Sequence, residues 1–224
     1  MKAMIFAAGK GERMRPLTDH TPKPLLLAAG KPIIEYTIEQ LVSAGFTELL
    51  INTAHLGAQF EQTLGDGSRW GVRIQYIDEA SEALETAGGI INALPYLGDE
   101  PFLVVNGDIA TQYNFASLRT RQIDWAHMVL IPNPAHHQEG DFHCLASGQL
   151  SLSGLPKFTY SGIGLYHPRA FWGRTPGVRK LRPVLEEGIA AQKITGEVYT
   201  DFWMDIGTVE RLQALDTYYR DLRG

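Results

Sequence analysis

The sequence predicts an α/β fold in which helices flank a mostly parallel, mixed sheet that carries a small antiparallel insertion. In the first half of the chain, short apolar runs alternate with segments of helical spacing. Such strand–helix–strand repetition is typical of parallel strands whose two faces are both covered. In the middle of the chain the apolar runs are shorter and closer together. This change of pattern indicates the antiparallel insertion.

The elements of the first half follow from these patterns in order. Apolar runs predict strands at residues 4–8, 48–52, 72–77 and 102–105. Helical spacing lies between them, at residues 33–44, 56–64 and 86–94. Gly45 is expected to end the first helix, because glycine readily adopts the left-handed conformation that closes a helix.

The second half has less regular patterns. Strands are predicted at residues 128–131, 142–146, 149–152, 160–166 and 202–206. Residues 178–191 and 209–222 are predicted to be helices. Because the sequence contains no linker, repeat or low-complexity tract, we expect one domain over residues 1–224.

The composition is that of an ordinary globular protein. Of its 224 residues, 44% are hydrophobic and 20% are charged, and the formal net charge is −5. A negative chain gives a nucleic-acid partner no overall electrostatic support, whereas a local group of cations would suit a small anionic ligand. The single cysteine, Cys144, excludes an intrachain disulfide, and no apolar run approaches membrane-spanning length. We therefore expect a cytoplasmic protein with no membrane and no nucleic-acid partner.

The most informative segment follows the first predicted strand. Residues 6–18 read FAAGKGERMRPLT, and residues 21–26 read TPKPLL. Small residues and two glycines after a buried strand let backbone N–H groups approach a polyphosphate, and Arg13 and Lys23 supply positive charge. The prolines on both sides of Lys23 restrict the backbone there, which suits a lysine that is held in one direction. The pattern predicts a nucleoside triphosphate site.

Two other phosphate-binding loops match this segment less well. A dinucleotide-binding fingerprint has a third glycine where this chain has Met14, and where it has an acidic residue near position 50, residues 49–52 (LLIN) offer only Asn52. A P-loop needs Gly-Lys-Ser/Thr, which this segment lacks. These differences disfavour an NAD(P)-dependent oxidoreductase. For the loop taken alone, a tight turn with surface cations stays an alternative.

Together with further motifs, the loop resembles that of the sugar-1-phosphate nucleotidylyltransferases. The further motifs are GKPII at 30–34, TAGG at 86–89, VVNGD at 104–108 and WMDIGT at 203–208. They occur in family order along nearly the whole chain. The chain is most similar to the short bacterial N-acetylmuramate α-1-phosphate uridylyltransferases of cell-wall sugar recycling.

This resemblance implies a Rossmann-like fold with a nucleotide-binding half at about 1–110 and a sugar-binding half at about 111–224. It also implies a reaction in which a sugar 1-phosphate attacks the α-phosphorus of a nucleoside triphosphate and pyrophosphate leaves. UTP is the expected nucleoside triphosphate. Such chemistry needs no covalent enzyme intermediate, so catalysis rests on positioning and charge neutralisation. Mg²⁺ is the implied cofactor.

The family motifs also imply roles for particular residues. The residues around the triphosphate are Ala8, Gly9, Gly11 and Glu12. Arg13 is assigned to the departing pyrophosphate, and Lys23 to the α-phosphate, where charge builds in the transition state. Asp108 follows a predicted buried strand, at the end of the sheet where α/β proteins bind ligands. With Asp205 it is implied to hold Mg²⁺, which takes one or two carboxylates plus phosphate oxygens. Taken singly, each aspartate also fits a turn or a helix cap.

Base and sugar contacts are implied at several further positions. Ala87 and Gly88 open a helix with small residues, so a nucleobase can lie against the backbone, although helix-to-sheet packing explains them equally well. Glu79 stands near the place where the family commonly has a glutamine, and Asn106 is expected to face the nucleotide or the sugar. The residues implied on the sugar side are Asn106, Gly140, Asp141, Gly162 and Lys157.

The chain departs from the family pattern just before its last predicted sugar-binding strand. Many relatives carry Glu-Lys-Pro there, whereas residues 154–157 read GLPK. An N-acetylmuramate acceptor brings a lactyl carboxylate, which needs a cation when it is desolvated. The candidate cations are Lys157, Arg174, Arg179, Lys180 and Arg182. An equal alternative is that this cluster caps and solvates the helix predicted from residue 178.

Other functions stay open on the sequence. The chain contains His136, His137 and His143, which match no regular metal-ligand spacing. A mannose-1-phosphate or glucose-1-phosphate nucleotidylyltransferase fits the same motifs, as does a non-catalytic nucleotide-sugar-binding regulatory protein. The joint presence of the four implied catalytic and metal-binding side chains favours an enzyme. We expect a monomer or a small homo-oligomer.

Overall fold

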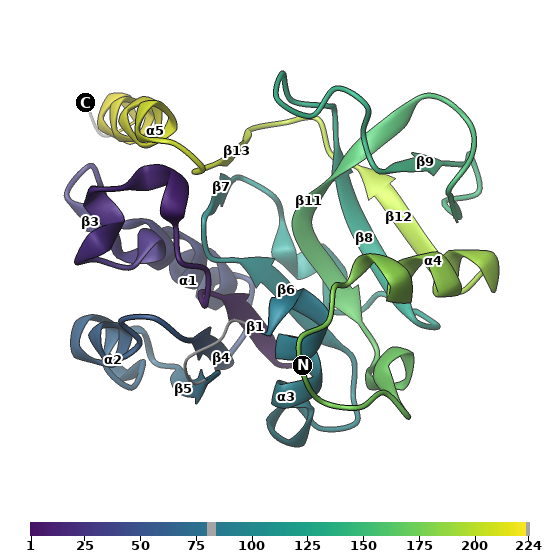
Figure 1. Cartoon of the computed structure of the whole chain (residues 1–224), viewed down its shortest axis with the longest axis horizontal. Coiled ribbons are helices and arrows are strands. Elements are labelled where there is room, and N and C mark those ends of the chain that lie inside the picture. The colour runs from purple at the N-terminus through teal and green to yellow at the C-terminus, as the bar shows by residue number, and fades with distance from the viewer. Residues whose placement is uncertain (80–83, 223–224) are drawn as a thin grey trace. The chain divides into compact units, whose positions relative to one another are not determined.

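The computed structural model describes residues 1–79 and 84–222 (Figure 1). The chain divides into two compact units that interleave along the sequence. The unit that contains the glycine-rich loop, called the loop unit, comprises Ala3–Ala83, Asn106–Ala116 and Phe202–Gly224. The other is called the β11 unit after its longest strand, and comprises Met1–Lys2, Leu84–Val105 and Ser117–Asp201.

Parallel strands form the centre of the loop unit. They are β1 (Ala3–Phe6), β4 (Glu48–Thr53) and β5 (Arg73–Asp78). β4 lies between the other two, because Leu49 pairs with Ala3 of β1 and with Ile74 of β5. All three residues are buried, as expected of apolar runs that are covered on both faces.

Two helices of the loop unit contribute side chains to a hydrophobic core that lies next to the candidate site. The helices of this unit are α1 (Ile33–Ser43), α2 (Ala58–Leu64) and α5 (Val209–Asp221). One cluster of buried apolar side chains joins α1 and α5 to segments that precede each of these helices. It consists of Met14, Leu26, Ala28, Ile33, Ala110, Ile206, Leu212 and Leu215. The cluster fixes Met14 and Ile206, so it also fixes the backbone of their neighbours Arg13 and Asp205.

Short antiparallel pairs complete the loop unit. One pair is β7 (Ile109–Thr111) with β13 (Trp203–Asp205), and the other is β2 (Leu27–Ala28) with β3 (Lys31–Pro32). In the first pair Asp205 lies opposite Ile109. The backbone N–H of Ile206 also donates to the carbonyl oxygen of Asp108 at 2.7 Å. This pairing brings the chain at Asp205 alongside the chain at Asp108.

β11 (Lys157–Tyr166) organises the second unit. It runs antiparallel to β6 (Phe102–Asn106), β8 (Ala126–Ile131) and β9 (Phe142–Cys144). β10 (Leu150–Ser151) pairs with β9, and β12 (Ile194–Val198) runs parallel to β8. The helices are α3 (Glu85–Leu97) and α4 (Arg182–Ala190). The predicted α/β class, with a mixed sheet and antiparallel strands in the middle of the chain, is confirmed.

Several elements differ from the prediction. The helix predicted at 178–191 begins only at Arg182, because Pro183 lacks an N–H and fits the first turn of a helix but not its interior. The β12 strand was not predicted, since Gly196 and Glu197 interrupt its apolar pattern. A Cβ on Gly196 would lie 2.9 Å from the carbonyl oxygen of Met128, so the glycine permits close strand pairing. β2, β3 and β7 were also missed, because they have only two or three residues each.

The helices of the described chain are all too short or too polar to cross a membrane. This holds for residues 1–79 and 84–222.

Candidate functional site

The glycine-rich loop leaves β1 and turns at Gly11. The φ of Gly11 is +66°, a left-handed conformation that glycine adopts without strain. The hydroxyl of Thr18 donates to the Gly11 carbonyl oxygen at 2.9 Å, and a Cβ on Gly11 would lie 2.9 Å from Cγ2 of Thr18. A short 3₁₀ turn, Glu12–Met14, follows at once, with Met14 fully buried. Only a glycine fits this turn without displacing Thr18.

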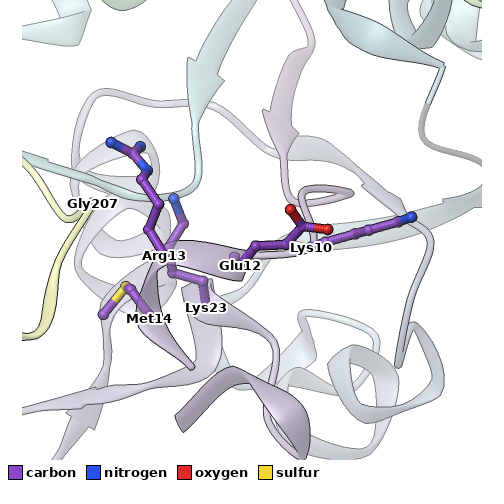
Figure 2. A pocket seen from close by; sticks show the side chains of 7 residues that line it. Lys10, Glu12, Arg13, Met14, Lys23 and Gly207 are labelled. Atoms are coloured by element: carbon purple, nitrogen blue, oxygen red, sulfur yellow. The ribbon is translucent and has the colours of Figure 1, made fainter. Parts of the chain in front are cut away.

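A pocket of about 390 Å³ lies over this turn. Its lining residues are Lys10, Gly11, Glu12, Arg13, Met14, Lys23 and Gly207. Figure 2 shows Arg13 and Lys23 extending to the same side, whereas Glu12 and Lys10 point the other way. The pocket thus combines the exposed backbone of a glycine turn with two cations, which is the chemistry of a polyphosphate site.

Lys23 forms an ion pair with Asp108 in the loop unit. The lysine begins a 3₁₀ turn, Lys23–Leu25, and its Nζ bonds Oδ2 of Asp108. The side chains are 13% and 27% exposed, so each charge is partly removed from water and the pair is stronger than one on the open surface. The structure therefore brings together two residues that the motifs implied separately.

Asp205 joins the same site through Gly207. Its Oδ2 pairs with Nη1 of Arg211 in the first turn of α5. A Cβ on Gly207 would lie 3.2 Å from Nη2 of Arg13, from Nη1 of Arg211 and from Oδ2 of Asp205. The second implied metal ligand thus stands beside the pocket wall, and its backbone runs alongside that of Asp108.

Glu79 is linked to the start of the loop by a buried asparagine. Asn52, at 2% exposure, accepts a hydrogen bond from the Ala7 N–H at 2.9 Å and donates to Oε1 of Glu79 at 2.6 Å. Glu79 is itself buried. In this structure Glu79 and Asn52 support the backbone immediately before Ala8 and Gly9.

Ala87 and Gly88 belong to the β11 unit, in the first turn of α3. Their backbone N–H groups both donate to the carbonyl oxygen of Arg179, at 3.0 and 3.1 Å. A Cβ on Gly88 would lie only 2.3 Å from the carbonyl oxygen of Gly177. The small residues at the start of α3 thus permit close packing of the segment that precedes α4.

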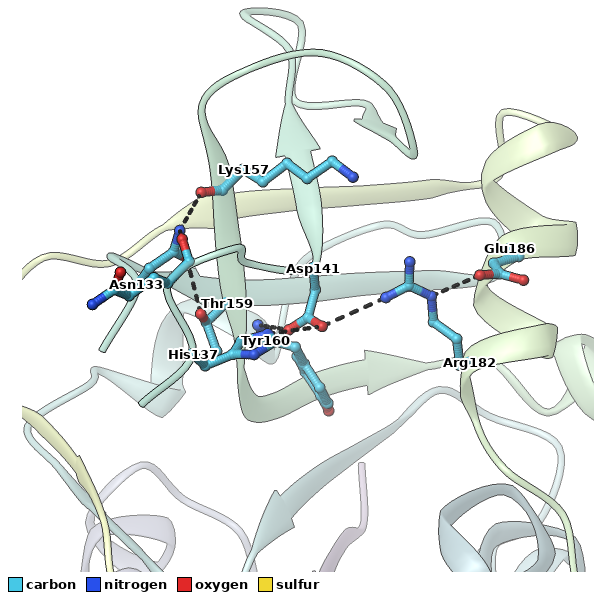
Figure 3. Close-up of polar contacts among 9 residues, drawn as sticks. Asn133, His137, Asp141, Lys157, Thr159, Tyr160, Arg182 and Glu186 are labelled. Atoms are coloured by element: carbon cyan, nitrogen blue, oxygen red, sulfur yellow. Dashed lines mark hydrogen bonds and ion pairs between the residues drawn. The ribbon is translucent and has the colours of Figure 1, made fainter. Parts of the chain in front are cut away.

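Asp141 is the centre of a polar network in the β11 unit (Figure 3). Its Oδ2 accepts the Tyr160 N–H at 2.8 Å, and its Oδ1 lies 3.3 Å from Nε2 of His137 and 3.5 Å from Nη1 of Arg182. Arg182 is also paired with Glu186 at 2.7 Å. These contacts fix the carboxylate and leave it about one quarter exposed.

Gly140 and Lys157 flank this network. A Cβ on Gly140 would lie 2.7 Å from Oδ1 of Asn133 and 2.9 Å from the carbonyl carbon of Lys157. The Lys157 carbonyl oxygen accepts from Nδ2 of Asn133 at 3.0 Å, while its ammonium extends away from Asn133 (Figure 3). Gly162, with φ +83°, lies at the irregularity where the register of β11 against β8 shifts. Asn106, at the end of β6, falls in the loop unit.

The candidate cations for a lactyl carboxylate differ in their surroundings. Arg174 pairs with Glu187 at 2.6 Å, and Arg179 bonds the side chain and the carbonyl oxygen of Thr175. Arg182 shares Asp141 and Glu186. Since α4 begins at Arg182, the cations that precede Arg182 in the sequence do not lie on that helix.

Sequence reasoning missed several residues of the site. Thr18, Asn52 and Arg211 each hold a predicted residue in place. Arg211 lies six residues after Asp205, and the two side chains meet beside Gly207. The described residues include no group of three histidine, cysteine or acidic side chains arranged to hold a metal ion.

Comparisons with known proteins show the family of this chain. Residues 2–144 match the family model described as nucleotidyl transferase. The N-acetylmuramate alpha-1-phosphate uridylyltransferase of Neisseria meningitidis serogroup B is 50% identical over 222 residues, covering 95% of this chain and 96% of the relative. The protein of the same name from Caulobacter vibrioides is 30% identical over 220 residues, covering 92% of this chain and 91% of the relative.

A solved structure shows the same fold. It is that of a Bacillus anthracis protein assigned as a glucose-1-phosphate thymidylyltransferase, in complex with sucrose. The TM-score is 0.86 at 22% identity, and the match covers 99% of this chain and 96% of the other. The resemblance implied by the sequence motifs is thereby confirmed. The chain belongs to the nucleotidyl transferase family.

Proposed function

We propose that this protein is a sugar-1-phosphate uridylyltransferase that makes UDP-N-acetylmuramic acid and pyrophosphate from UTP and N-acetylmuramate α-1-phosphate. The observation that carries the proposal is the convergence of Arg13, Lys23, Asp108 and Asp205 around one glycine-lined pocket. The choice of UTP and of this acceptor is supported by the relative that is 50% identical over almost its whole length. A role in cell-wall sugar recycling would follow from this activity.

The reaction needs positioned charge more than it needs acid–base chemistry. An oxygen of the sugar phosphate forms the new bond to the α-phosphorus of UTP, and the bond from that phosphorus to the oxygen bridging to the β-phosphate breaks. Gly11 and Glu12 present backbone N–H groups to the triphosphate, next to Ala8 and Gly9. Arg13 neutralises the departing pyrophosphate, and Lys23 stabilises the charge that builds on the α-phosphate.

The donor set at Asp108 and Asp205 fits Mg²⁺. Two carboxylates on paired segments of chain, next to a phosphate pocket, are what a hard cation that keeps water and phosphate ligands requires. When bound, Mg²⁺ would neutralise charge on the phosphate oxygens. Asp108 is ion-paired with Lys23 and Asp205 with Arg211, so bound Mg²⁺ would compete with these two cations for the carboxylates.

The contacts to the base and the sugar are part of the same proposal. We assign the base to the backbone at Ala87 and Gly88, with Glu79 and Asn106 as further nucleotide contacts. On the sugar side, the fixed carboxylate of Asp141 is suited to accept hydrogen bonds from hydroxyl or amide groups. Gly140, Gly162 and Asn106 offer close approach or polar contact.

Lys157 is the cation that we assign to the lactyl carboxylate. Within residues 1–79 and 84–222, its ammonium makes no ion pair, in contrast to Arg174 and Arg182. We further propose that residues 1–224 act as one catalytic domain, as a monomer or small homo-oligomer in the cytoplasm.

The test is pyrophosphate release by the purified protein, with the common nucleoside triphosphates crossed against several sugar 1-phosphates. We expect release with UTP and N-acetylmuramate 1-phosphate, in the presence of Mg²⁺, to exceed every other combination. A preference for GTP with mannose 1-phosphate, or for glucose 1-phosphate, would replace the assigned substrates. Binding of nucleotide sugars without any turnover would contradict the enzyme itself.

A further inference from the structure

Arg211 is the cation that holds Asp205. It lies in the first turn of α5, where its backbone N–H donates to the hydroxyl of Thr208 at 3.3 Å. Its Nη1 pairs with Oδ2 of Asp205 and also donates to the Asp205 carbonyl oxygen at 3.5 Å. The two side chains are 24% and 23% exposed. An ion pair shielded to this degree is stronger than one on the open surface.

Arg13 reaches the same point from the glycine-rich loop. Its Nη2 and Nη1 of Arg211 both lie 3.2 Å from the position that a Cβ on Gly207 would take, as does Oδ2 of Asp205. Two guanidinium groups therefore meet beside one carboxylate, next to the pocket that Gly207 lines. Because one carboxylate neutralises only one of these cations, this corner of the pocket attracts a further anion.

This arrangement couples the two kinds of ligand that the site is proposed to bind. Arg211 and a divalent cation are both positively charged, so they compete for the Asp205 carboxylate. With the metal on Asp205, Arg13 and Arg211 would stand together without a counter-ion, which is unfavourable unless an anion enters as well. A triphosphate supplies the missing negative charge, so each ligand lowers the cost of binding the other.

Building on the proposed function, we propose that Arg211 is a positioning residue that occupies Asp205 in the empty site and makes divalent-metal binding depend on the triphosphate. Without ligands it keeps the Asp205 carboxylate in place and competes with a divalent cation for it. With the triphosphate present it turns to the phosphate oxygens and releases Asp205.

The experiment measures Mn²⁺ binding to the whole protein without nucleotide, from the electron paramagnetic resonance signal of the free ion. Arg211→Ala is expected to bind Mn²⁺ about fivefold more tightly than the unchanged protein, the scale of one partly exposed ion pair. Calorimetry in EDTA should show UTP binding weakened by a similar factor.

Arg220→Ala is the matched control. It also removes an arginine of α5 that is paired with an aspartate, since Arg220 Nε lies 2.6 Å from Oδ2 of Asp216. This pair stands outside the pocket lining, so Arg220→Ala should leave the Mn²⁺ and UTP affinities unchanged. The control separates competition at Asp205 from the general effect of removing one positive charge.

An Mn²⁺ affinity of Arg211→Ala that is unchanged or lower would overturn the proposal, because Arg211 then does not compete for Asp205. Asp205→Asn distinguishes this from failure of the proposed function. If Asp205→Asn keeps full Mn²⁺ binding, the assignment of Asp205 as a metal ligand is wrong. If it loses Mn²⁺ while Arg211→Ala is unchanged, only the role of Arg211 fails. Should Arg211→Ala not fold, Arg211→Gln carries the same test, because it removes the charge and keeps most of the side chain.

Discussion

Gly11 offers a sharp test of the loop, because one added methyl group has two separable effects there. Its φ of +66° is a conformation that an alanine adopts with strain. A Cβ would also lie 2.9 Å from Cγ2 of Thr18 and 3.3 Å from Cβ of Lys23. Thr18 is buried and bonded to the Gly11 carbonyl oxygen, and its branched side chain is stiff, so it cannot rotate away freely.

The expected cost is the sum of two contributions. A non-glycine residue in the left-handed region costs about 1–2 kcal/mol. Crowding a packed site with one methyl group costs about 1–3 kcal/mol, so Gly11→Ala should lower the free energy of unfolding by about 2–5 kcal/mol. Gly30→Ala is the matched control: its φ is +78°, and among the described residues nothing lies within 4 Å of a Cβ there. It should show the first contribution alone.

Urea unfolding followed by circular dichroism measures the difference, and steady-state kinetics measures its consequence for the site. Because Gly11→Ala also pushes on Lys23, we expect its kcat/KM for UTP to fall at least about tenfold, as small misplacements of positioned groups do. Gly30→Ala should stay close to the unchanged protein in activity. Equal stability and equal activity of the two variants would refute the argument that Gly11 is packed against Thr18 and Lys23.

Four further predictions concern the charges and the packing of the site. Lys23→Ala should lower kcat more than it weakens UTP binding, whereas Arg13→Ala should weaken UTP and pyrophosphate together; equal KM effects with unchanged kcat in both would contradict these roles. Asp108→Asn should lower turnover at least about 100-fold without unfolding the protein, and near-normal rates at limiting Mg²⁺ would be inconsistent with a ligand there. Lys157→Ala should lower the kcat/KM ratio of N-acetylmuramate 1-phosphate over N-acetylglucosamine 1-phosphate by about tenfold, while Lys193→Ala, a matched lysine change, should preserve it. Gly88→Ala should lower the free energy of unfolding by about 1–3 kcal/mol because its Cβ meets the Gly177 carbonyl oxygen, and an unchanged urea midpoint would contradict that packing.

The prediction from sequence was most accurate for elements whose ends are set by local residues. α1 was predicted almost to its ends, because its helical spacing is clear and Gly45, with φ +85°, follows it. The helix before residue 191 was predicted four residues too long at its start, since its helical spacing extends to residues before Pro183. The alternation of apolar residues did not predict β12, because Gly196 interrupts it. This glycine permits close pairing between strands and does not form a turn.

The candidate site shows the same division. The motifs predicted Lys23 and Asp108 as site residues. Their ion pair was not predicted, because it depends on the packing of segments that are distant in the sequence. Asn52 was considered only as a poor ribose ligand, whereas it is a buried link between Ala7 and Glu79. Arg211 belongs to none of the motifs, because its approach to Asp205 depends on how the start of α5 packs beside Gly207.

The most direct test of the central claim is the stoichiometry of the reaction, followed by phosphorus NMR of the purified protein with UTP, Mg²⁺ and N-acetylmuramate α-1-phosphate. The account predicts that one UDP-sugar and one pyrophosphate appear together for each UTP consumed, and that omitting the sugar phosphate stops the consumption of UTP. UTP that stays unchanged, or that yields UMP and pyrophosphate without a sugar nucleotide, would contradict it.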